Sequence, residues 1–116
     1  MAVTVYGIPN CDTTKKALAL LKKHKTDFSF YDYKQQGISK EKLQGWIAKL
    51  GLEMIFNKRS TTWKELPAAE QKKAGNETGA IQLMMQHNSI IKRPVIEIGD
   101  EILAGFNETA ITKQLK

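Results

Sequence analysis

The stretch YGIPNCDTTKKALALL, residues 6–21, contains the only cysteine of the chain and marks a change from strand to helix. Just before it, Val3 and Val5 alternate with Thr4, a pattern typical of a β-strand. After it, the residues expected on the inner face of an amphipathic helix recur at helical spacing: Ala17, Leu20, Leu21 and His24. The loop between this strand and this helix therefore carries Cys11.

A second strand is predicted in DFSFYDY, residues 27–33, where Phe28 and Phe30 alternate with Ser29 and Tyr31. Two strands joined by a helix form a βαβ unit, in which the strands should be parallel.

The middle of the chain, from Ser39 to His87, is predicted to be largely helical. Ser39 suits the N-cap of a helix that Gly51 ends, and its apolar face comprises Leu43, Trp46, Ile47 and Leu50. Two more helices are expected, one in ELPAAEQKKAG (residues 65–75) and one in NETGAIQLMMQH (residues 76–87), the second capped by Asn76 and burying Ile81, Met84 and Met85.

Strand character returns in RPVIEIGDEILAG, residues 93–105, where Gly99 and Asp100 form a two-residue turn that suits a hairpin. Asn107 is expected to cap a last helix, with Phe106 and Ile111 at the positions of a hydrophobic staple. The order β α β, helical stretch, β β α describes an α/β chain with four strands.

Length and composition favour one compact domain over residues 1–116. The chain has 116 residues, of which 41% are hydrophobic and 26% charged, as in a globular protein in water, and no apolar run is long enough to span a membrane. The N-terminus has no signal-peptide pattern, and a lone cysteine favours a reducing compartment, so a cytoplasmic location is expected.

The net charge of +6 does not by itself predict nucleic-acid binding. The 18 basic residues are scattered along the chain with no run longer than two, so most belong on solvated helix faces. The excess can attract an anionic small molecule. With one cysteine and no histidine pair at ligand spacing, no metal site is expected.

Cys11 is either a reactive thiol or a small buried residue. A cysteine just before a helix lies where unpaired N–H groups and the helix dipole favour the thiolate. Lys15 and Lys16 add positive charge, whereas Asp12 opposes ionisation. Thr14 occupies the place of the second cysteine in a Cys-x-x-Cys motif, so it can hydrogen-bond a thiolate but cannot resolve a mixed disulfide.

A second cue lies in IIKRPVIEIG, residues 90–99. Pro94 opens a strand, where its missing N–H costs least, and the bond before it is a candidate cis peptide. Arg93 supplies a fixed positive charge with forked donors that suit a carboxylate or an oxyanion, although many arginines are solvated surface residues.

Three motifs together resemble the arsenate reductase (ArsC)/Spx family, and most closely its YffB-like branch of small uncharacterised or glutathione-linked reductases. They are VYGIPNCDTTKKAL (residues 5–18), NKRSTTWKEL (57–66) and IIKRPVIEIGDEILAGF (90–106). The resemblance covers nearly the whole chain. It implies a thioredoxin-like fold with a four-stranded mixed sheet and a helical insertion at about residues 36–90.

The resemblance also implies roles for individual residues. Cys11 matches the nucleophilic cysteine, and Arg93 matches the arginine that precedes a cis-proline, here Pro94. In the middle motif Arg59 matches the arginine of the Spx branch, whereas Asn57 stands where arsenate reductases have theirs. The third arginine of true arsenate reductases has no counterpart, because Gly105 or a neighbour occupies its place.

These departures order the functional hypotheses. Fewer arginines weaken arsenate as the substrate, and Thr14 removes the second cysteine that Spx regulators commonly carry. The leading hypothesis is a thiol reductase that forms a mixed disulfide on Cys11 and is regenerated by an external thiol, glutathione or glutaredoxin, with no bound cofactor. Arg93, Pro94, Arg59, Thr14 and Lys15 would bind the substrate or stabilise the thiolate. The alternatives are arsenate reduction through a Cys11 arseno-adduct and a non-catalytic protein that binds RNA polymerase.

Overall fold

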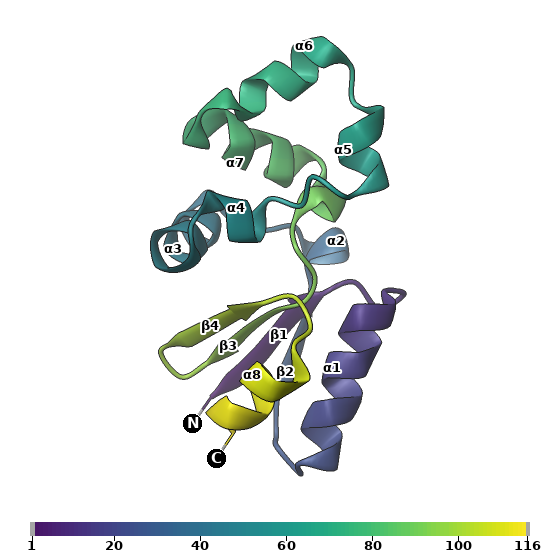
Figure 1. The fold of residues 1–116 in the computed structure, drawn as a ribbon, viewed down its shortest axis with the longest axis vertical. Helices are drawn as coiled ribbons and strands as arrows, with labels where there is room; N and C mark the ends of the chain where they lie inside the picture. The colour runs from purple at the N-terminus through teal and green to yellow at the C-terminus, as the bar shows by residue number, and fades with distance from the viewer. Residues whose placement is uncertain (1, 116) are drawn as a thin grey trace. The chain divides into compact units, whose positions relative to one another are not determined.

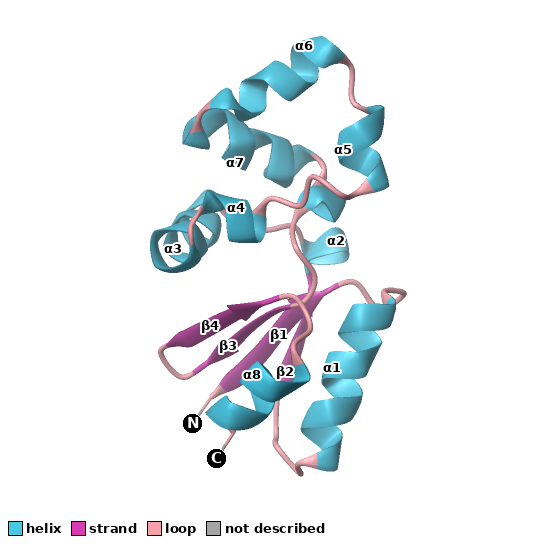
Figure 2. Ribbon diagram, in the orientation of Figure 1, coloured by secondary structure: helices cyan, strands magenta, loops and turns pink. Residues whose placement is uncertain are grey.

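The computed structural model describes residues 2–115, whose helices and strands form two compact units (Figure 1). Among the described residues, the first unit comprises 2–36 and 93–115, and the second comprises 37–92. Figure 2 shows that strands lie in the first unit and that helices dominate the second. The prediction of a single domain with an insertion at about 36–90 stays a prediction.

The first unit is built on a mixed four-stranded sheet in the order β2-β1-β3-β4. The strands are β1 (Val3–Gly7), β2 (Ser29–Asp32), β3 (Val95–Ile98) and β4 (Glu101–Ala104). β1 is parallel to β2 and antiparallel to β3, and β3 and β4 form the predicted hairpin across Gly99 and Asp100. The predicted thioredoxin-like α/β fold with a four-stranded mixed sheet is confirmed.

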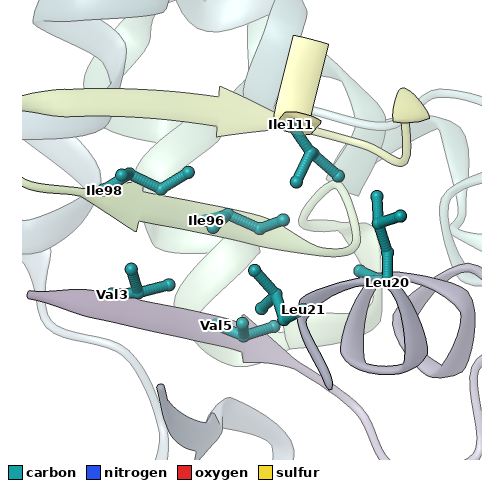
Figure 3. Close-up of a cluster of buried hydrophobic side chains, with 8 residues drawn as sticks. Val3, Val5, Leu20, Leu21, Ile96, Ile98 and Ile111 are labelled. Atoms are coloured by element: carbon teal, nitrogen blue, oxygen red, sulfur yellow. The ribbon is translucent and has the colours of Figure 1, made fainter. Parts of the chain in front are cut away.

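One face of this sheet carries the core of the first unit (Figure 3). The strand registers place four apolar side chains in one row across the sheet: Phe30, Val5, Ile96 and Leu103. Helices α1 (Asp12–Lys23) and α8 (Glu108–Gln114) contribute their buried side chains to the same cluster: Ala17, Leu20, Leu21 and Ile111. The alternation of Val3 and Val5 with Thr4 correctly predicted a strand, and both valines belong to this cluster.

The caps of the first unit also follow the sequence. The Asn107 side chain accepts a hydrogen bond from Ala110 N at 3.0 Å, and Phe106 packs against the core cluster that contains Ile111. His24 is a correction, because it lies past the end of α1 and is exposed, although its spacing suggested the buried face. Tyr33 is another, since it begins helix α2 (Tyr33–Gln36) instead of ending β2.

The second unit is helical, as predicted. Its elements are α3 (Lys40–Leu50), α4 (Leu52–Ile55), α5 (Thr61–Glu65), α6 (Ala68–Gln71), the 3₁₀ helix η1 (Lys72–Gly75), α7 (Glu77–Gln86) and the 3₁₀ helix η2 (Asn88–Ile90). Ser39 caps α3 by accepting from Lys42 N at 3.1 Å, and Asn76 caps α7 by accepting from Gly79 N at 2.8 Å. Gly51, with φ of 90°, ends α3.

Two predictions in this unit are wrong. Residues 65–75 do not form one helix, because Leu66 precedes Pro67 and is forced into an extended conformation with ψ of 140°, which ends α5. Met85 is 43% exposed instead of buried. Leu83 takes the inward position on α7, and Met85 lies about 200° around the helix from it.

Among residues 2–115, no helix combines the length and the apolar character that crossing a bilayer requires.

Candidate functional site

The strand order of the first unit brings three distant segments to one edge of the sheet (Figure 1). Gly7 ends β1, and Cys11 follows it in the loop to α1. Because β3 is antiparallel to β1 and Val95 pairs with Tyr6, the residues before Val95 lie at the same edge. Because β2 is parallel to β1 and Asp32 pairs with Gly7, the residue after Asp32 lies there too. The edge therefore gathers Cys11, Arg93 and Tyr33.

Cys11 is the N-cap residue of α1. Its backbone is extended, with φ of −101° and ψ of 125°, and its carbonyl accepts the first helical hydrogen bond from Lys15 N at 2.9 Å. Its own N–H donates to Ile8 O at 3.1 Å and closes a turn. The thiol is partly exposed, so Cys11 is not the buried packing residue that one interpretation of the sequence allowed.

The sulfur takes part in a short hydrogen-bonded chain. Cys11 Sγ lies 3.0 Å from Thr13 Oγ1, and the Thr13 hydroxyl donates to the Arg93 carbonyl oxygen at 3.2 Å. Thr13 thus connects the start of α1 to the segment that precedes β3.

Thr14 is fully buried, with no hydrogen-bond partner for its Oγ1. It packs against Gly7, where a Cβ atom would come within 2.8 Å of Thr14 Oγ1 and 2.9 Å of Thr14 Cγ2. The absence of a side chain at Gly7 is what allows α1 to begin so close to β1.

The pKa of the Cys11 thiol lies below its ordinary value. Desolvation by partial burial is the largest influence and raises it, but four smaller effects together outweigh this: the hydroxyls and the backbone N–H groups of Thr13 and Thr14. Neither N–H forms a capping hydrogen bond with Sγ, and the Thr14 hydroxyl forms no hydrogen bond, so these three groups act on the sulfur as nearby dipoles. Lys15, expected to stabilise the thiolate, is exposed and is not among these causes.

Tyr33 shares this environment. It is fully buried, and burial raises the pKa of its phenol far above its usual range. The Arg93 charge opposes that rise in pKa, whereas negative charge on Cys11 or Asp32 adds to it. The phenol therefore stays neutral at physiological pH and lies within electrostatic reach of both the thiol and the guanidinium.

Arg93 and Pro94 are joined by a cis peptide bond. The Pro94 carbonyl accepts a hydrogen bond from Gly105 N at 2.7 Å, which ties the segment to the end of β4. Arg93 is half-buried, and within residues 2–115 its guanidinium makes no hydrogen bond and no ion pair. The site thus includes a fixed cation that has no hydrogen-bond or ion-pair partner among these residues and acts on the Tyr33 phenol.

Arg59 lies in the second unit. It is exposed and borders a cavity of about 520 Å³ together with Lys58 and Lys92. Its backbone N–H donates to Asn57 Oδ1 at 3.1 Å, which fixes the turn before α5. Its predicted part in binding the substrate of Cys11 stays a prediction.

Sequence reasoning missed Thr13 and Tyr33. Attention to the Cys-x-x-Cys spacing singled out Thr14 and passed over Thr13, whose contact with Arg93 spans 80 residues. The place of Tyr33 could have been predicted, because it follows a strand parallel to β1 and so lies at the same edge of the sheet as the residues that follow β1.

Comparisons with known proteins identify the family of the chain. The ArsC family profile matches residues 6–114. An uncharacterised protein of Haemophilus influenzae is 39% identical over 106 residues, which are 91% of this chain and 92% of the relative. The solved structure of a YffB protein is 40% identical, with a TM-score of 0.92 over 99% of this chain and all of the other.

A more distant relative is the global transcriptional regulator Spx of Streptococcus pyogenes, which is 29% identical over 94% of this chain and 81% of its own. The profile match and the two nearer relatives span almost the whole sequence. The chain therefore belongs to the ArsC family, and within the ArsC/Spx proteins to the YffB-like branch.

Proposed function

We propose that this chain is a thiol oxidoreductase in which Cys11 is the nucleophile and glutathione is the external thiol. The observation that carries the proposal is the environment of Cys11 at the start of α1, where the hydroxyls and N–H groups of Thr13 and Thr14 lower the thiol pKa. Membership of the ArsC family and its arsenate reductase-like class of thiol oxidoreductases supports the same reading.

The reaction takes two exchange steps. The Cys11 thiolate attacks the glutathione sulfur of a mixed disulfide, so that a Cys11–glutathione disulfide forms and the substrate thiolate leaves and takes a proton from water. A second glutathione thiolate then attacks the glutathione sulfur on Cys11, which releases oxidised glutathione and restores the Cys11 thiolate. Thr14 offers no sulfur, so both electrons come from glutathione or from an equivalent thiol such as glutaredoxin.

The groups around Cys11 would orient the incoming glutathione. The unpartnered Arg93 guanidinium suits a glutathione carboxylate, and the backbone beside Pro94 suits its peptide groups. Arg59 and Lys15 would add attraction for an anionic substrate. A reducing cytoplasm would keep Cys11 available.

The direct test is catalysis of glutathione-dependent reduction of a glutathionylated peptide. The protein should accelerate the reaction over the same concentration of a cysteine-containing peptide, and Cys11→Ser should abolish the acceleration. Equal rates with the protein and with the peptide would overturn the proposal.

Family membership also favours a second candidate, arsenate reduction through a Cys11 arseno-adduct. Against it, Gly105 or a neighbour stands where the resemblance places a third arginine, and few fixed cations remain to hold a multiply charged oxyanion beside a thiolate. Glutathione-coupled turnover of arsenate at millimolar concentration, lost in Cys11→Ser, would favour this candidate over disulfide exchange.

The Spx relative favours a third candidate, a binding protein of the transcription machinery. Recovery of RNA polymerase subunits by the wild-type chain and equally by Cys11→Ser would support it, because binding of that kind would not need the thiol.

A further inference from the structure

We propose that the Thr13 hydroxyl is a two-position donor that hydrogen-bonds the Arg93 carbonyl while Cys11 is a thiol and turns to the sulfur when Cys11 is a thiolate. Ionisation of Cys11 thereby frees the Arg93 carbonyl. The inference rests on the proposed function in one respect, since the freed carbonyl would serve the incoming glutathione or disulfide. It makes Thr13 a positioning residue.

The Thr13 hydroxyl can donate to only one acceptor at a time. A threonine hydroxyl has one hydrogen to donate, and both Cys11 Sγ at 3.0 Å and the Arg93 carbonyl oxygen at 3.2 Å lie within its reach. A carbonyl oxygen only accepts. While Thr13 donates to Arg93, the Cys11 S–H must therefore be the donor to Thr13 Oγ1, and all three groups are satisfied.

Loss of the thiol proton reverses one of these bonds. A thiolate can only accept, so a hydroxyl that keeps its hydrogen on the Arg93 carbonyl would present an oxygen lone pair to a negative sulfur at 3.0 Å. Rotation about the Thr13 side chain replaces that repulsion with a charge-assisted hydrogen bond. The proton of Cys11 goes to solvent, and Thr13 itself neither gains nor loses a proton.

The position of Thr13 permits this rotation of its side chain. Thr13 is exposed, and its partners belong to segments that the antiparallel pairing of β1 with β3 holds side by side. The charged and titratable groups around it include Asp12 and Lys15 on α1, Asp32 at the end of β2, Tyr33 on α2, and Arg93. Asp12 and Lys15 are exposed, Tyr33 is neutral, and the Arg93 charge acts on the Tyr33 phenol.

The freed carbonyl has a use in the proposed reaction. Like the sulfur, it lies within hydrogen-bond distance of Thr13 Oγ1, and it would accept a hydrogen bond from an amide N–H of the bound glutathione or peptide. The site would then offer its acceptor to a substrate only when the nucleophile is ready to react.

The test follows the Arg93 carbonyl carbon by carbon-detected NMR that correlates it with the Pro94 nitrogen, a well-resolved signal because the chain has 3 prolines. Thiolate absorbance measured in parallel gives the Cys11 titration. In wild-type protein the carbon shift should change with the same midpoint as Cys11. In Thr13→Val more than half of that change should disappear, Cys11 should titrate at higher pH, and alkylation near pH 7 should slow at least about threefold.

Two variants complete the test. Thr13→Ser retains the hydroxyl and should restore both titrations. Thr109→Val is the matched control, because Thr109 is the second residue of α8 as Thr13 is of α1, and it is exposed. A carbon shift that does not titrate in wild-type protein, or that keeps more than half its amplitude in Thr13→Val, would overturn the inference.

The outcome is independent of catalysis, because no substrate is present in the titration. A protein that shows the coupling but fails to accelerate disulfide exchange would disprove the proposed function alone. A protein that accelerates the exchange without the coupling would disprove this inference alone.

Discussion

Cys11 owes its lowered pKa to hydroxyl and amide dipoles and not to a neighbouring lysine. Desolvation works against the thiolate, and the groups that outweigh it belong to the two residues Thr13 and Thr14. The sequence shows a cysteine before a helix and two lysines in the first turn, which draws attention to charge. The direction in which a hydroxyl points depends on local geometry that sequence patterns do not encode, so Thr13 could not be singled out in advance.

A pH-dependent stability should follow from this shift. The folded state lowers the pKa of Cys11, so it favours the thiolate more than the unfolded chain does. The stabilisation is present in full above the ordinary value of 9.0 and is lost as the pH falls through the lowered pKa. Urea unfolding should show a larger advantage of wild type over Cys11→Ser at about pH 9.5 than at about pH 6. An advantage independent of pH would contradict the lowered pKa.

Arg93 should matter more for turnover than for stability, because its guanidinium has no partner among the described residues. Arg93→Ala should lower glutathione-dependent turnover about tenfold, because one charged hydrogen bond to the substrate is lost. The same change should alter the free energy of unfolding by under about 1 kcal/mol. Arg93→Lys should fall between, and Lys22→Ala, which removes an exposed cation of α1, should act as wild type. Parallel losses of turnover and stability in Arg93→Ala would make the arginine structural.

At the scale of elements, the junction of β1 and α1 positions the site. The short loop between them places Cys11 at the helix start, and the close approach of Thr14 to Gly7 fixes where that helix begins. Sequence patterns predicted both elements well, because alternation and helical spacing report directly on burial. They did not reveal the contact between Gly7 and Thr14, which depends on the packing of two elements against each other.

This contact can be tested with a double-mutant cycle. Gly7→Ala should destabilise the protein by about 1–3 kcal/mol, since its Cβ would overlap the Thr14 side chain. In a Thr14→Ala background the same change should cost much less. Gly45→Ala is the control, because it has open space in α3 and should stabilise the helix by about 0.5–1 kcal/mol. Equal costs of Gly7→Ala in both backgrounds would show that the overlap is not the cause.

At the scale of the whole molecule, strand order brings the site together. Cys11, Tyr33 and Arg93 are distant in sequence and meet because β1 pairs with β2 on one side and with β3 on the other. Local patterns gave the order of strands along the chain but not their order in the sheet. The family resemblance supplied the fold name and matched Cys11 and Arg93 to site positions, and the structure supplies the order β2-β1-β3-β4 that brings them together.

In the helical unit, the sequence predicted the helix caps but missed one helix boundary and one exposed side chain. The caps at Ser39 and Asn76 could be predicted from the sequence because each depends only on residues close to it in the chain. The break at Pro67 and the exposure of Met85 were missed, since helical composition outweighed one proline and the pattern left the inward face of α7 ambiguous.

Mass spectrometry of the protein with oxidised glutathione tests the reactive role of Cys11 most directly. Each chain should take up one glutathione, mapped to Cys11, faster near pH 7 than a peptide with an ordinary cysteine does. Reduced glutathione should remove it, and Cys11→Ser should take up none. An adduct that forms no faster than on the peptide, or none at all, would contradict a reactive Cys11.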